Sequence, residues 1–127
     1  MKRVILTTDA PAPIGPYSQA ISFGSVLYVS GQIAIEPASG DLVLSDIESE
    51  THQVLKNLGA ILKEAGIGYE QVLKCSVFVK DINMFSRINT IYAQYFTGEQ
   101  PPARELVEVA NLPRFVNIEI SAIAALS

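Results

Sequence analysis

Polar and apolar residues alternate in two runs near the end of the chain, at residues 104–109 and 116–122. In the first run Arg104 and Leu106 share one side, and in the second Glu119 belongs to the polar side. A period of two is typical of β-strands. Because the connecting loop is short, we predict a hairpin, and any register in which the paired residue numbers have an odd sum places Arg104 and Glu119 on one face. If that sum is 225, the two residues lie diagonally, about 7–8 Å apart between Cα atoms.

The rest of the chain predicts further strands and two helices. Ser45 and Glu48 have the spacing of a capping box, and the apolar stripe that follows them ends at Gly66. The expected strands cover residues 3–6, 18–23, 26–30 and 72–80, and the expected helices follow residues 45 and 81. This order predicts an α+β fold for one domain, residues 1–127, with two helices on one face of a mixed sheet of about six strands.

The run at residues 72–80 predicts a sheet face that no helix covers. Alternation places Leu73 and Cys75 on an apolar side, and Val72 and Phe78 on the other side. Apolar residues on an uncovered face would meet water, and such a face usually binds another chain. We therefore predict that the protein forms oligomers through this face.

Composition argues against several classes of function. The 127 residues are 49% hydrophobic and 17% charged, with a net charge of −4, which argues against disorder and against binding many phosphates. With one histidine, His52, and one cysteine, Cys75, we expect neither a disulfide nor a metal site, and neither side chain is expected to be catalytic. The sequence has no apolar leader and no long apolar run, so we expect a cytoplasmic protein without a membrane segment.

The strongest candidates for chemistry are Arg104 and Glu119. A guanidinium binds carboxylates through paired hydrogen bonds, and a glutamate can position or deprotonate water. The alternative is a cross-strand ion pair with a structural role only. Tyr17 ends a stiff loop with three prolines, where its hydroxyl could reach a ligand or its ring could cover a sheet edge, and Gly31 permits a bulge or a close approach by a ligand.

Six blocks of sequence, in order, resemble the Rid family, also called YjgF or liver perchloric-acid-soluble protein. They lie at residues 15–20 (GPYSQA), 29–33 (VSGQI), 77–81 (VFVKD), 102–104 (PAR), 107–113 (VEVANLP) and 118–124 (IEISAIA). The resemblance implies a chorismate-mutase-like fold and a homotrimer with three clefts between subunits. It also implies hydrolysis of 2-imino acids, released by pyridoxal-phosphate enzymes, to 2-oxo acids and ammonia without a cofactor.

The same resemblance implies roles for individual residues. Arg104 would bind the substrate carboxylate and Glu119 would act on the attacking water. The positions implied to line the cleft, some of them from a neighbouring subunit, are Tyr17, Ser30, Gly31 and Asn89.

One departure from the family pattern leaves other functions open. Deaminase members commonly carry Ser-Cys where this chain has Glu105-Leu106, and Leu106 is expected beside Arg104. A more apolar floor would favour a bulkier imino acid, or would mark a protein that binds 2-oxo or other small carboxylic acids without efficient turnover. A third function, as an endoribonuclease or translation inhibitor, is disfavoured by the acidic composition and the absence of clustered basic residues.

Overall fold

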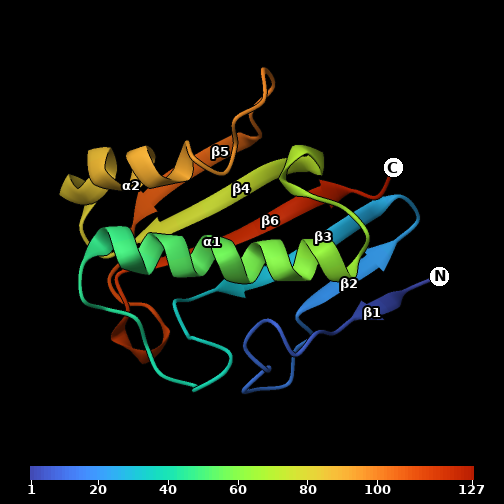
Figure 1. The fold of residues 1–127 in the computed structure, drawn as a ribbon, viewed down its shortest axis with the longest axis horizontal. Helices are drawn as coiled ribbons and strands as arrows, with labels where there is room; N and C mark the ends of the chain where they lie inside the picture. The colour runs from blue at the N-terminus through green and yellow to red at the C-terminus, as the bar shows by residue number, and fades with distance from the viewer.

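The computed structural model describes residues 1–127 and shows six strands in one sheet of order β1-β2-β3-β6-β4-β5 (Figure 1). The strands are β1 (Arg3–Ile5), β2 (Ala20–Phe23), β3 (Val26–Gln32), β4 (Val72–Val79), β5 (Ala103–Glu108) and β6 (Ile118–Ala125). Helices α1 (Ile47–Glu64) and α2 (Phe85–Tyr92) lie on the same side of the sheet, and the three short 3₁₀ turns are Tyr69–Gln71, Ile82–Met84 and Pro113–Phe115. The predicted α+β fold with two helices on one face of a mixed sheet is confirmed.

The predicted hairpin of the last two strands is wrong. β5 pairs with β4 in parallel, and β6 pairs antiparallel with both β3 and β4, so β4 separates β5 from β6. The helix between β4 and β5 explains this arrangement, because a strand, a crossover helix and a second strand place the two strands in parallel. β6 alternates buried and half-buried residues throughout and takes a central place, whereas the mostly exposed β5 takes the edge.

Helix α1 packs an apolar stripe against the sheet, as predicted. Val54, Leu58 and Ile61 are fully buried members of the stripe. The predicted capping box at Ser45 is wrong, since the N-cap is Asp46, whose Oδ1 accepts a hydrogen bond from the Ser49 amide at 2.6 Å. An aspartate performs this role as well as a serine does, so the helix begins one residue later than the pattern suggested.

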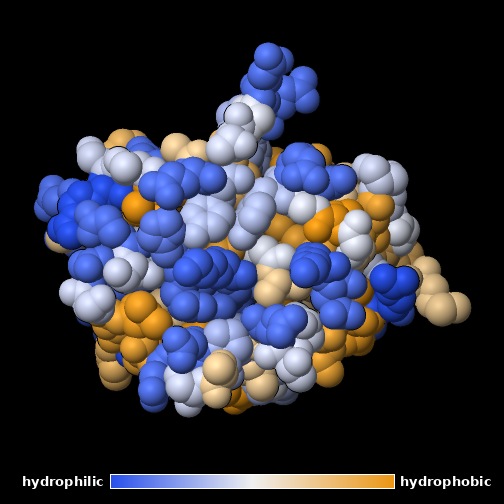
Figure 2. Space-filling view, viewed as in Figure 1, coloured by the Kyte–Doolittle hydropathy of each residue, from blue (hydrophilic) through white to orange (hydrophobic).

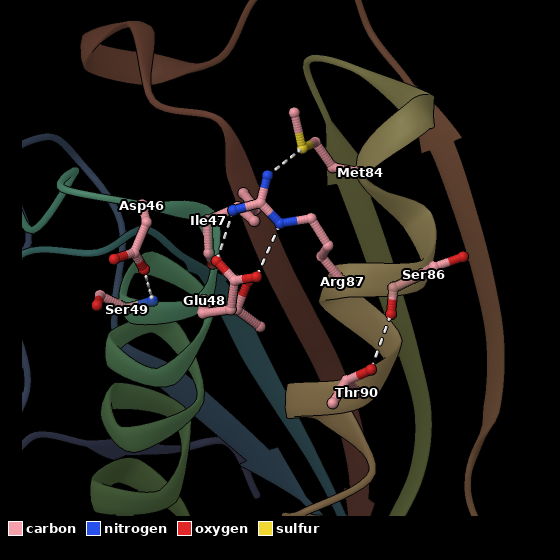
Figure 3. A network of polar contacts seen from close by, with 9 residues as sticks. Asp46, Ile47, Glu48, Ser49, Met84, Ser86, Arg87 and Thr90 are labelled. Atoms are coloured by element: carbon pink, nitrogen blue, oxygen red, sulfur yellow. Dashed lines mark hydrogen bonds and ion pairs between the residues drawn. The ribbon is translucent and has the colours of Figure 1, made fainter.

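One polar contact ties the two helices together. In Figure 3 the guanidinium of Arg87, on α2, lies against the carboxylate of Glu48, on α1, with two nitrogen–oxygen distances of 2.7 Å. This paired arrangement of donors and acceptors is the strongest geometry available to an arginine and a carboxylate.

A bulge at the start of β4 corrects the predicted faces. The pairing of β4 with β6 shifts between Val72 and Lys74, so Val72 is buried in the core while Leu73 is 52% exposed. The prediction assigned each of these two residues to the wrong face. A bulge inserts one residue into the strand and so inverts the alternation of the residues before it. From Cys75 onward the alternation is as expected, with Cys75 fully buried and Phe78 on the uncovered face.

The two faces of the molecule differ in polarity. Hydrophilic residues lie along the middle of the helical face, over α1, in Figure 2. On the other side, strand pairing places Val4, Phe23, Tyr28 and Val107 on the uncovered sheet face, and each of them is more than 40% exposed. Neither helix combines the length and apolar character needed to cross a lipid bilayer.

Candidate functional site

The ladder between β3 and β6 is interrupted where Gly31 approaches Glu119. The pairing shifts between Val29 and Gln32, so Ser30 and Gly31 have no regular partner on β6. A Cβ atom on residue 31 would collide with the carboxylate of Glu119, at 2.7 Å from its Cδ. Only glycine leaves room for the carboxylate at this position.

A pocket of about 350 Å³ opens beside the Glu119 carboxylate. Ser30 and Gly31 form part of its wall, and apolar wall segments come from the proline-rich loop and from Pro113. Tyr17, which is 49% exposed, also lines the pocket. The volume is sufficient for a small organic molecule.

Burial in this pocket raises the pKa of Glu119 above its usual value. No ion pair and no hydrogen bond involve its carboxylate, and Tyr17 is the only other titratable side chain in the pocket wall. Loss of solvation therefore remains uncompensated, which makes the carboxylate more basic than an exposed glutamate. A general base for activating water benefits from such an increase.

The proline-rich loop is held over the pocket by Gln19, whose side chain is almost fully buried. Its Oε1 accepts a hydrogen bond from the Thr7 amide at 2.8 Å, and its Nε2 donates to the carbonyls of Thr7 and Pro11 at 3.0 and 2.9 Å. Ser30 also contributes, because its hydroxyl donates to the Ser18 carbonyl at 2.6 Å. The loop that carries Tyr17 is thus fixed from both sides of the hairpin.

A second polar cluster lies between β5 and α2. Arg104 donates from Nη1 to Oδ1 of Asn89 at 2.8 Å, and its guanidinium lies 4.8 Å from the ring centroid of Tyr92. Leu106 is on the same face and packs against the core. Glu105 points the other way and pairs with Lys74 at 3.1 Å. The cluster presents a half-buried cation held in one orientation by an amide and a ring.

The two clusters lie on opposite faces of the sheet. Arg104 is level with Cys75 of β4, and Glu119 is level with Phe78. Positions three apart on a strand face opposite ways, and strand spacing places the two Cα atoms about 14 Å apart. The predicted convergence of Arg104 and Glu119 in one cleft of a single chain is therefore wrong. The structure groups Tyr17, Ser30 and Gly31 with Glu119, and it groups Asn89 and Leu106 with Arg104.

Two buried polar residues of α1 escaped the sequence analysis. Glu50 is fully buried and accepts hydrogen bonds from the amides of Asn117 and Ile118, and Asn57 is 1% exposed and donates to backbone carbonyls after β3. A signal was present, because both positions fall at helical spacing on the apolar stripe of α1. A polar residue on a buried stripe needs a partner.

His52 lies outside both clusters, whereas Cys75 lies on β4 level with Arg104, under the second cluster. Nδ1 of His52 is 2.7 Å from the Tyr95 hydroxyl, in a half-buried contact. Burial raises the pKa of the Cys75 thiol, which keeps it protonated.

Fold and site together define a small α+β protein with two features. One is a glutamate whose pKa is raised by burial in an apolar pocket, and the other is an arginine on the edge strand that an asparagine and a tyrosine hold in one orientation. The comparisons with known proteins agree with this class. Residues 7–126 match the family described as endoribonuclease L-PSP. A RutC family protein from Pyrococcus horikoshii is 53% identical over 124 residues, which cover 98% of each chain. The 2-iminobutanoate/2-iminopropanoate deaminase of Homo sapiens is 48% identical over 98% of this chain and 90% of its own.

Solved structures give the same result. A Rid family protein, YyfA from Yersinia pestis, has a TM-score of 0.96 and 51% identity over 98% of this chain and 99% of its own. TdcF of E. coli, with bound serine, has a TM-score of 0.93 and 39% identity over 98% and 99% of the two chains. The chain belongs to the endoribonuclease L-PSP family, which is the Rid or YjgF family, as the resemblance predicted.

Proposed function

We propose that this protein hydrolyses 2-imino acids to 2-oxo acids and ammonia, in sites that two subunits of a homotrimer build together. The observation that carries the proposal is the raised pKa of Glu119 in an open pocket beside Gly31. Relatives 48% identical to this chain are named deaminases of this kind in mouse and human.

The separation of the Arg104 cluster from the Glu119 cluster within one chain supports a site that is shared between two subunits. Arg104 and Glu119 lie on opposite faces of one chain, so a substrate that touches both needs two chains. The uncovered apolar face around Tyr28 and Val107 supplies a surface for such an assembly. In the proposed trimer, the Arg104 cluster of one subunit completes the Glu119 pocket of the next.

The chemistry needs few groups. Arg104 binds the substrate carboxylate, and the iminium carbon is already electrophilic. Glu119 takes a proton from water as the oxygen bonds to that carbon and the C=N electron pair moves to nitrogen. The protonated Glu119 then gives the proton to the amine, the C–N bond breaks as the hydroxyl becomes a carbonyl, and the hydroxyl proton leaves with ammonia as ammonium.

Leu106 would contact the substrate beside Arg104, since both residues lie on the helical face of β5. An isobutyl group there, in place of a cysteine, enlarges the apolar part of the site. We therefore propose a preference for imino acids with larger apolar side chains.

The direct test couples the purified protein to a threonine dehydratase and follows formation of 2-oxobutanoate. The wild type should accelerate this step, and Arg104→Ala and Glu119→Gln should each remove the acceleration. Equal rates with wild type, with either variant and without protein would contradict the proposal.

A second candidate is a protein that binds 2-oxo or other small carboxylic acids without turnover. The TdcF structure, with bound serine, supports the capacity of a relative to hold a small amino acid. Under this alternative Arg104→Ala would abolish binding in calorimetry, Glu119→Gln would retain it, and neither would change the rate of 2-oxobutanoate formation.

RNA cleavage, to which the family description refers, would show as nuclease activity in a metal-free preparation polished by ion exchange.

A further inference from the structure

Two buried polar side chains lie on one face of α1, seven residues apart. Glu50 is fully buried and Asn57 is 1% exposed, and the seven-residue step places both on the side that faces the sheet. A carboxylate without water is costly to bury, so its partners should explain its presence.

Glu50 binds the chain just before Glu119. Its Oε2 accepts hydrogen bonds from the amides of Asn117 and Ile118 at 2.7 and 3.2 Å, and its Oε1 accepts from Nδ2 of Asn117 at 2.8 Å. All three donors belong to the two residues that precede Glu119. The carboxylate therefore fixes the backbone from which the Glu119 side chain extends.

Asn57 binds the chain just after Gly31. Its Nδ2 donates to the carbonyls of Ile33 and Ile35 at 3.1 and 2.9 Å. Its Oδ1 accepts from Nε2 of Gln53 at 2.9 Å, which fixes the orientation of the amide. Ile33 and Ile35 also line the pocket beside Glu119.

These contacts stand where the ladder between β3 and β6 is interrupted. The β3–β6 ladder is irregular between Val29 and Gln32, next to the approach of Gly31 to Glu119. Ladder hydrogen bonds normally fix the relative position of neighbouring strands. β4 still pairs with β6 at Ile118 and Glu119, but the missing link between the β6 segment and the Gly31 segment is supplied by one helix, through Glu50 on one side and Asn57 on the other.

We infer that Glu50 and Asn57 are positioning residues that hold the Glu119 carboxylate against Gly31 in its pocket. As a statement about catalysis this inference rests on the proposed deaminase function, but the geometry that it describes can be measured without turnover.

The test compares Glu50→Ala, Asn57→Ala and Glu50→Gln with a matched control, Thr51→Val. Thr51 is fully buried in the same turn of α1, but its hydroxyl donates to the Ile47 carbonyl within the helix and touches neither segment. In Glu50→Gln the new amide can accept from both backbone amides and donate to a rotated Asn117. That variant removes the charge but keeps the tether.

The first measurement is the ¹³C carboxyl titration of Glu119 in each folded variant. Among the pocket residues only Tyr17 is also titratable, so the Glu119 signal reports mainly on its burial. Both alanine variants should lower the Glu119 titration midpoint, by about 0.5 pH unit or more, as the carboxylate reaches solvent. Glu50→Gln and Thr51→Val should match the wild type.

The second measurement is steady-state kinetics with the dehydratase-coupled assay. The alanine variants should lower kcat about tenfold or more with KM within about twofold, because misplacing the base affects the reaction more than carboxylate binding. Thr51→Val should keep the wild-type kcat, even if its melting temperature falls as much as that of the alanine variants.

An unchanged Glu119 titration midpoint in the folded alanine variants would overturn the inference. A Glu119 midpoint below the wild-type value in Glu50→Gln would also overturn it, because the shift would then come from the lost charge of Glu50 and not from lost positioning. If the wild type itself shows no turnover, the proposed function fails, and the titration still decides the positioning. If Glu50→Ala does not fold, Asn57→Ala and Glu50→Gln give the answer.

Discussion

The Cα atom of Gly31 faces the side chain of Glu119 so closely that a methyl group at residue 31 would lie 2.7 Å from Cδ of the carboxylate. Gly31→Ala should therefore push the carboxylate out of its place. We expect kcat to fall by about tenfold to a hundredfold, because a displacement near 1 Å has such effects on a reacting group. The coupled 2-oxobutanoate assay measures this change.

Gly98→Ala is the control for that substitution. A Cβ at residue 98 would meet no atom within 4 Å. The rate should stay at the wild-type value, and both variants should unfold within about 1 kcal/mol of the wild type, since the displaced group in Gly31→Ala is the end of a flexible side chain. Full activity of Gly31→Ala would show that the location of the carboxylate does not matter.

Mixing two inactive variants should restore activity. If each site takes Arg104 from one subunit and Glu119 from the next, then subunits with Arg104→Ala and subunits with Glu119→Gln can form intact sites together. Random exchange of equal amounts in a closed ring gives roughly a quarter of the sites both functional groups. The measurement is the coupled rate after unfolding and refolding the mixture, beside each variant refolded alone. A mixture as inactive as its components would argue for sites within one chain.

Stability should depend on the protonation of Glu119. Burial raises its pKa above the usual 4.5, so the folded chain binds this proton more tightly than the unfolded chain. The contribution to stability is then most favourable at low pH and decreases as the pH rises from 4.5 through the folded pKa. Glu119→Gln should be more stable than the wild type at pH 7 and equal to it near pH 4, by denaturant unfolding at both values. A difference that grows toward low pH would contradict this sign.

The ion pair in Figure 3 predicts the opposite dependence on pH. Hydrogen bonding from Arg87 lowers the pKa of Glu48 from 4.5 to about 2. Its contribution to stability is present above pH 4.5 and is lost as the pH falls from 4.5 through 2. Glu48→Gln should be less stable than the wild type at pH 6, and the two melting temperatures should converge toward pH 2. Because both side chains are exposed, high salt should reduce the difference at pH 6.

Removing the amide of Gln19 should loosen the loop over the pocket. Gln19→Leu leaves the Thr7 amide and the carbonyls that Nε2 contacts without partners, which should lower the free energy of unfolding by about 2 kcal/mol. Urea titration measures the loss. Gln94→Leu, at an exposed position without a side-chain hydrogen bond, should change stability little. Equal stability of the two variants would show that water replaces the Gln19 contacts.

The sequence predicted most of the helices and strands, but it did not predict which strands lie side by side in the sheet. Period-two alternation identified β5 and β6 as strands, yet alternation carries no information on which strand lies beside which. The crossover through α2 places β5, which carries Arg104, parallel to and beside β4. The hairpin prediction did not take this helix into account. Val72 was placed on the wrong face because a bulge leaves no mark in a pattern of apolar residues.

The site was predictable by residue type more than by geometry. The Rid family resemblance indicated Tyr17, Ser30, Gly31 and Glu119, which the structure brings to one pocket. Glu50 was missed because a helical glutamate usually faces solvent, and only its place on an apolar stripe could have marked it. The separation of Arg104 from Glu119 depends on the order of strands in the sheet, which no local pattern encodes.

The burial of Cys75 has a practical use. Maleimides and related reagents attack exposed thiolates, and this thiol is enclosed between the sheet and the helices with its pKa raised. A cysteine introduced at Gly98, where a new side chain meets no atom within 4 Å, would therefore be the only thiol that a fluorophore or spin label reaches in the folded protein. Distances between labels on different copies could then be measured without first replacing the native residue.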